Sequence, residues 1–139
     1  MVEFKADGLA LKIESHSTAD SEDWAQVLVE SSCNGFNGRF IAWMQTEDLE
    51  RFSKQLSRMV TDIGQELTAA LVSAEPDLEL ELKPDRRGHI KGSYRLESER
   101  RDGTPTSLSG AFDMDQTYIP LLLAQVHELT ERLRGLKRT

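Results

Sequence analysis

Residues 107–136 read SLSGAFDMDQTYIPLLLAQVHELTERLRGL, and this stretch decides the fold. Alternating apolar residues over 108–112 predict a strand, which runs into a turn over residues 113–116. Thr117 is then expected to be a helix N-cap, because its hydroxyl can accept from the free backbone N–H groups of a first turn. Apolar residues follow at three- and four-residue steps, namely Ile119, Leu122, Val126, Leu129, Leu133 and Leu136. A stripe this long must be buried against a broad surface.

The chain before this stretch contains one more helix and several strands. Period-two alternation predicts strands near residues 2–5, 9–14, 24–31 and 36–44. Asn34-Gly35 is typical of a hairpin turn, because both residue types tolerate positive φ. Asn37-Gly38 fits a bulge in the returning strand. Thr46 is expected to cap the first helix, whose apolar positions are Leu49, Phe52, Leu56, Met59 and Ile63.

The second half repeats this order. Strands are expected near residues 67–72, 78–82 and 90–96, and a charged loop over residues 97–105 leads to the closing strand and helix. Short connections make neighbouring strands antiparallel. We predict a single α+β domain over residues 1–139, of order ββββα-ββββα. In it a mainly antiparallel, curved sheet of about eight strands covers the apolar sides of two helices.

Charge and composition exclude several classes of partner. The formal net charge is −7 and the pI is near 5.0. Binding to nucleic acid or to anionic lipid needs a basic surface, so neither is expected. An acidic surface suits a basic protein partner, and it also serves ordinary solubility. Neither a signal peptide nor a membrane span is recognisable, so we expect a cytoplasmic protein, either a monomer or a homodimer.

Cysteine and histidine give no sign of a metal or cofactor site. Cys33 is the only cysteine, which excludes an intrachain disulfide, and we expect it to pack as a small apolar group. The three histidines, His16, His89 and His127, lack the spacing of metal ligands. We therefore expect no metal and no cofactor.

Asp113 and Asp115 are the one candidate pair for general acid–base catalysis. Such chemistry needs two carboxyl groups whose pKa values are pushed apart. Both residues precede a helix, however, where acidic side chains stabilise the helix dipole and the first turn. The structural role is favoured, and no catalytic residue is assigned.

The loop over residues 16–23 carries the densest negative charge. Asp20, Glu22 and Asp23 lie there, directly before Trp24. Such charges are usually only solvated, but they could also speed the association of a basic protein. We therefore take Asp20, Glu22, Asp23 and Trp24 as candidate partner-binding residues.

Several short motifs together resemble a known bacterial family. They are Gly35-Phe36-Asn37-Gly38, the run Thr46-Glu47-Asp48-Leu49-Glu50-Arg51-Phe52 with Leu56, the hairpin over 78–88, and Asp115-Gln116-Thr117-Tyr118-Ile119. In this order, over roughly residues 2–135, they are similar to the WapI-type immunity proteins. The resemblance implies an intracellular antitoxin that binds and blocks a toxin domain, with no catalytic residue.

The sequence therefore supports a non-enzymatic intracellular binding protein, an immunity protein whose partner is a basic toxin domain. Two alternatives stay open. One is a carrier that holds a small ligand in a cavity between the curved sheet and the helices. The other is a hydrolase that uses Asp113 and Asp115.

Overall fold

A computed structural model describes residues 1–62, 67–75, 77–85, 87–99 and 101–135. The first half contains β1 (Val2–Ala6), β2 (Leu9–Ser15), β3 (Trp24–Cys33), β4 (Phe36–Gln45) and helix α1 (Thr46–Thr61). The second half contains β5 (Ala69–Val72), β6 (Leu78–Pro84), β7 (His89–Glu99), β8 (Pro105–Asp115), the 3-10 helix η1 (Gln116–Tyr118) and helix α2 (Ile119–Leu133). The predicted α+β class and the order ββββα-ββββα are confirmed.

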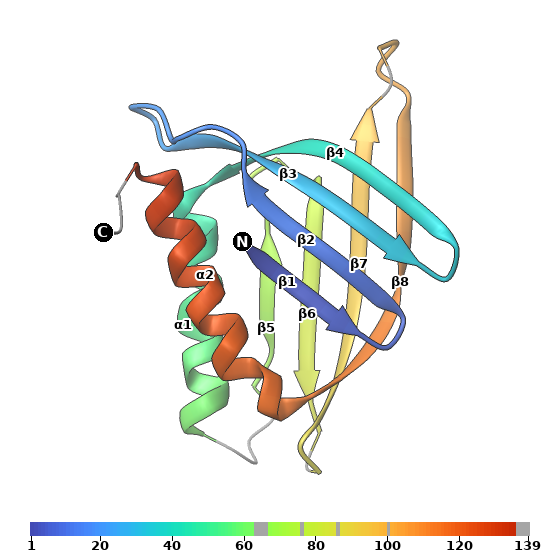
Figure 1. The fold of residues 1–139 in the computed structure, drawn as a ribbon, viewed down its shortest axis with the longest axis vertical. Coiled ribbons are helices and arrows are strands. Elements are labelled where there is room, and N and C mark those ends of the chain that lie inside the picture. Colours follow the sequence, from blue (N-terminus) through green and yellow to red (C-terminus); the bar gives the residue numbers. More distant parts are fainter. Residues whose placement is uncertain (63–66, 76, 86, 100, 136–139) are drawn as a thin grey trace.

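The eight strands form two antiparallel sheets of four, each a simple meander in chain order. Figure 1 shows the strands of the first sheet crossing in front of those of the second, with both helices along one side. The two sheets also touch through a short bridge, in which Asp7 and Asp113 exchange backbone hydrogen bonds of 3.0 and 2.9 Å. Each half of the chain thus supplies one sheet and one helix.

One apolar core fills the space between the sheets and the helices. Because side chains alternate along a strand, every second residue points inward, and these are the buried ones. Helix α1 buries Leu49, Phe52, Leu56 and Met59, and α2 buries five of the six predicted stripe residues, Ile119, Leu122, Val126, Leu129 and Leu133. Ile63 and Leu136, the last apolar position predicted for each helix, lie outside the described residues.

The predicted helix starts are wrong by one or more residues. Helix α1 begins at Thr46 itself, so the N-cap is Gln45 rather than Thr46. At the second helix, β8 continues through Asp113 and Asp115, where a turn was expected. Asp115 Oδ1 then accepts from Thr117 N over 2.9 Å, so Asp115 caps the 3-10 helix and Thr117 is not the cap.

Two predicted irregularities of the strands are also wrong. Asn37 and Gly38 pair regularly with Ser32 and Ser31, so β4 has no bulge there. The expected charged loop over 97–105 is shorter, because β7 runs to Glu99 and β8 begins at Pro105. Pairing between these two strands takes up residues 97–99 and Pro105, which were expected in the loop.

Candidate functional site

The β3–β4 hairpin exposes an apolar sheet face to solvent. Asn34 (φ 50°) and Gly35 (φ 88°) form its tight turn, as the sequence predicts, and this turn fixes the pairing along the whole ladder. Leu28 therefore lies opposite Ile41, and Gln26 lies opposite Trp43. We call the outward-facing residues Trp24, Gln26, Leu28, Ile41 and Trp43 the β3–β4 outer face.

Two tryptophans dominate the β3–β4 outer face. Trp24 and Trp43 occupy diagonal positions on adjacent strands, and their rings meet edge to face, with centroids 6.5 Å apart and planes at 82°. Trp43 is 43% exposed and Ile41 is 39% exposed. A solvated antiparallel sheet normally has polar residues on such a face, so this surface is unusually apolar.

The acidic loop lies at the Trp24 end of this face and is built from its own hydrogen bonds. Asp20 Oδ1 accepts from Glu22 N over 2.9 Å and from Trp24 N over 3.0 Å. Asp23 has a positive φ of 66°, and its carboxylate accepts from Thr46 Oγ1 and Glu47 N at the start of α1. Two of the three predicted acids thus hold the loop and the helix in place.

Glu22 is placed differently from its neighbours. Its backbone carbonyl accepts from Gln45 Nε2 over 3.3 Å, and its carboxylate forms neither a hydrogen bond nor an ion pair with the part of the chain that the structure describes. The structure therefore brings the four predicted residues together. Whether they bind a partner stays a prediction, and only the Glu22 carboxylate among the three acids lacks an internal role.

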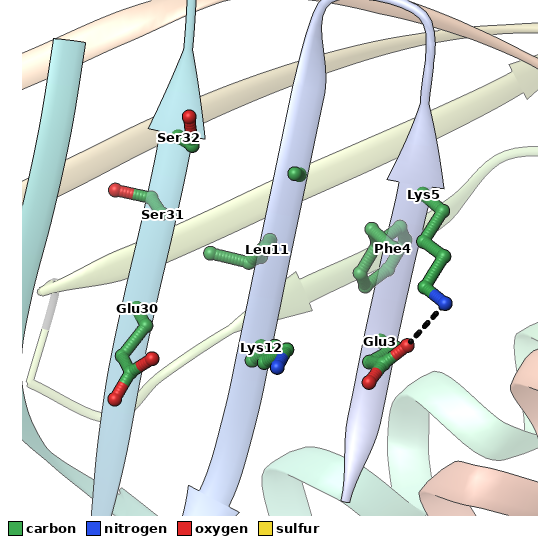
Figure 2. A pocket seen from close by; sticks show the side chains of 9 residues that line it. Glu3, Phe4, Lys5, Leu11, Lys12, Glu30, Ser31 and Ser32 are labelled. Atoms are coloured by element: carbon green, nitrogen blue, oxygen red, sulfur yellow. Dashed lines mark ion pairs between the residues drawn. The ribbon is translucent and has the colours of Figure 1, made fainter.

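A shallow pocket of about 210 Å³ lies on the same outer side of the first sheet, over β1, β2 and β3. Figure 2 shows Glu3, Lys12 and Glu30 in a row across these strands, and they are neighbours in the strand register. Lys5 pairs with Glu3 at 3.3 Å, and Arg39 pairs with Glu30 at 3.4 Å. The charges of the pocket are thus largely balanced within the sheet.

Asp113 and Asp115, the candidate catalytic pair, have separate partners in the structure. Asp113 Oδ1 lies 3.1 Å from Nε2 of His89, and both side chains are about half exposed. The hydrogen bond from Thr117 N holds the pKa of the Asp115 carboxyl below its usual range, as suits a cap rather than a proton donor. Neither aspartate lines the pockets described for this chain. No cluster of three metal-ligating side chains occurs among the described residues.

Comparison with known families gives a match over nearly the whole chain. The model of the immunity protein WapI-like family matches residues 3–134. The chain belongs to this family. No curated protein matches the chain. The family resemblance predicted from the short motifs is confirmed, and the match covers both four-stranded sheets and both helices.

The WapI-like family is a family of immunity proteins, so the chain has, in general terms, a toxin-neutralising binding role. Within the described residues, no helix is both long and apolar enough to cross a membrane.

Sequence reasoning missed most of the β3–β4 outer face. Trp43, Leu28 and Ile41 are not among the residues that the sequence singles out. A signal was present in β4, because apolar residues occupy both phases of its alternation: Phe40, Ala42 and Met44 face inward while Ile41 and Trp43 face outward. A strand that is apolar on both sides needs cover on both sides.

The core below this hairpin contains one buried hydroxyl group that is not paired, that of Ser31, among the described residues. Ser31 is 7% exposed, and its Oγ is without a hydrogen-bond partner among the described residues. It borders a cleft of about 180 Å³ between the two sheets, which Phe40, Leu96 and Leu108 also line. Nearby, Cys33 is buried as the sequence predicts, and its thiol hydrogen-bonds with Tyr94.

Proposed function

We propose that this chain is a cytoplasmic immunity protein that neutralises a basic toxin domain by binding it stoichiometrically. The observation that carries the proposal is the WapI-like family match over residues 3–134. The net charge of −7 supports a basic partner, because complementary charge speeds encounter and excludes like-charged competitors. The partner-binding residues proposed from the sequence, Asp20, Glu22, Asp23 and Trp24, remain part of the proposal.

A non-enzymatic role is supported by what the acidic side chains do. Asp23 and Asp115 accept backbone hydrogen bonds at helix starts, and Asp48 accepts from Gln45 N and Ala74 N over 3.0 Å each. These carboxylates contribute to stability as bound anions. In this proposal the protein blocks its toxin by covering it, as a single domain that is a monomer or a homodimer.

The test uses the toxin domain encoded beside the gene of this chain. Toxin activity is measured while the protein is added from well below to above one equivalent, with a toxin domain of unrelated sequence as the control. A binding inhibitor should abolish activity only near one equivalent, and calorimetry should give the same stoichiometry. Loss of toxin activity at a small fraction of an equivalent would indicate catalysis, and the absence of both binding and protection would refute the proposed function.

A further inference from the structure

The β3–β4 outer face has the composition of a protein contact. Aromatic and aliphatic side chains that cluster on an otherwise polar surface mark interaction sites, and tryptophan is the most enriched residue at the centre of interfaces. Here Trp24 packs against Trp43, and Leu28 lies opposite Ile41, so the four apolar side chains adjoin one another. They point away from the core. Within the described residues no strand is paired with the outer edge of β4, where the Asp77 carboxyl accepts from the Trp43 backbone.

The charges around this face are mostly negative. Glu22 lies beside Trp24 in the acidic loop, and Glu14 on β2 lies opposite Leu28. Glu47 follows at the start of α1, where Arg51 pairs with it at 3.9 Å. The nearest cation of β4, Arg39, already pairs with Glu30 at 3.4 Å. A partner that covers the apolar centre must therefore bring positive charge to the rim.

We propose that the β3–β4 outer face is the surface that docks the toxin domain. The partner places an apolar or arginine side chain against the Trp24–Trp43 pair, where a guanidinium gains cation–π attraction, and its other basic side chains lie opposite Glu22 and Glu14. This inference rests on the proposed function, and it adds the binding face and the chemistry of the partner's surface.

The geometry also dictates which substitutions test the surface. Asp20 and Asp23 hold the loop and the start of α1, so changing them would disturb the fold as well as any contact. The Glu22 side chain has no such task, and Trp43 and Ile41 face solvent. Val72 is a matched control, because it is 45% exposed on the outer face of the other sheet.

The experiment measures binding of the same toxin domain to the full-length protein by calorimetry and by stopped-flow association. Trp43→Ala should weaken the equilibrium affinity by about tenfold or more, as expected for a central aromatic residue. Glu22→Lys should slow association severalfold at low salt, and the effect should fade as salt is added. Val72→Ala should bind like the unchanged protein. Thermal melts of each variant show whether the fold is kept.

The outcomes separate this inference from the proposed function. If the unchanged protein fails to bind or inhibit the toxin, the proposed function falls and the docking surface falls with it. If it binds while Trp43→Ala and Glu22→Lys bind equally well, only the docking surface is refuted. A loss of affinity on Phe36→Ala instead would move the contact to the opposite face of β4. Sedimentation in which Trp43→Ala breaks a homodimer without affecting toxin binding would also refute it.

Discussion

Thr46 Oγ1 donates a hydrogen bond of 2.6 Å to Asp23 Oδ1, although the two residues are 23 positions apart in the sequence. The other carboxylate oxygen of Asp23 accepts from Glu47 N over 3.2 Å. Helix α1 therefore receives a second carboxylate at its start from the loop before β3, in addition to Asp48, which accepts from Gln45 N in the helix's own capping box. This contact ties the acidic loop to the helix and holds Trp24 at the edge of the β3–β4 outer face.

Asp23→Ala should lower the free energy of unfolding by about 1–2 kcal/mol, the usual cost of losing a helix cap. Alanine also tolerates the positive φ of 66° poorly. Asp23→Asn should cost less, because asparagine accepts this φ and keeps an oxygen acceptor. Urea denaturation of the three proteins measures the difference. An Asp23→Ala midpoint equal to that of the unchanged protein would show that the cap contributes nothing.

Two buried serines should respond oppositely to the same substitution. The Ser31 hydroxyl has no partner in the described structure, so Ser31→Ala removes a desolvated polar group and should raise stability by about 1 kcal/mol. Ser73 Oγ accepts from Leu78 N over 3.2 Å and donates to the Glu75 carbonyl. Ser73→Ala should therefore lower stability by about 1–2 kcal/mol. Thermal melts decide, and a loss of stability in both variants would contradict the prediction for Ser31.

The element order followed from the sequence because it depends on local periodicity. Alternation and the three- to four-residue helical step are read within a few residues, and each strand and helix was found in this way. The helix caps were not predicted correctly in this way. A preference for threonine caps selects Thr46 and Thr117, whereas Gln45 and Asp115 occupy the cap positions just before them, and Asp23 reaches the start of α1 from a distant loop. The contact from Asp23 is tertiary, so no rule based on neighbouring residues predicts it.

The apolar surface could not be predicted residue by residue, because it depends on the register in which β3 and β4 pair. Trp24 and Trp43 adjoin one another only because the two-residue turn at Asn34-Gly35 sets the ladder between β3 and β4. The sequence predicts this turn, but the contact between the tryptophans follows only from the ladder that the turn sets. The division of eight strands into two sheets likewise needs non-local packing, since antiparallel neighbours look the same in either arrangement.

Gly92 allows an aromatic ring to cross the centre of the second sheet. A Cβ at this position would overlap the Phe112 ring, which lies on the facing residue of β8. Gly92→Ala should therefore destabilise the protein by about 1–3 kcal/mol through overpacking. Phe112→Leu replaces the ring with a smaller side chain, so Gly92→Ala should cost much less stability in the Phe112→Leu background. Four-way urea denaturation measures this coupling, and strictly additive effects would exclude a clash between the two residues.

Tyr94 should make stability depend on pH in the alkaline range. Burial, with the hydrogen bond to the Cys33 thiol next in importance, raises the pKa of Tyr94 to about 12. Between about pH 10 and 12 the unfolded chain has lost this proton while the folded chain keeps it, so stability falls as pH rises. The loss is at most about 1.4 kcal/mol per pH unit. Below about pH 10 the tyrosine is protonated in both states and contributes no slope.

The test compares urea denaturation of the unchanged protein and Tyr94→Phe from neutral to alkaline pH. Every other ionisable group is common to both proteins, so the difference between the two curves isolates Tyr94. Burial also raises the pKa of Tyr118, the other tyrosine, and its contribution likewise cancels in the difference. We expect the stability of Tyr94→Phe to fall less steeply above about pH 10. Parallel curves would mean that Tyr94 ionises as readily in the folded chain as in the unfolded one, which its buried position against Gly110 and Cys33 opposes.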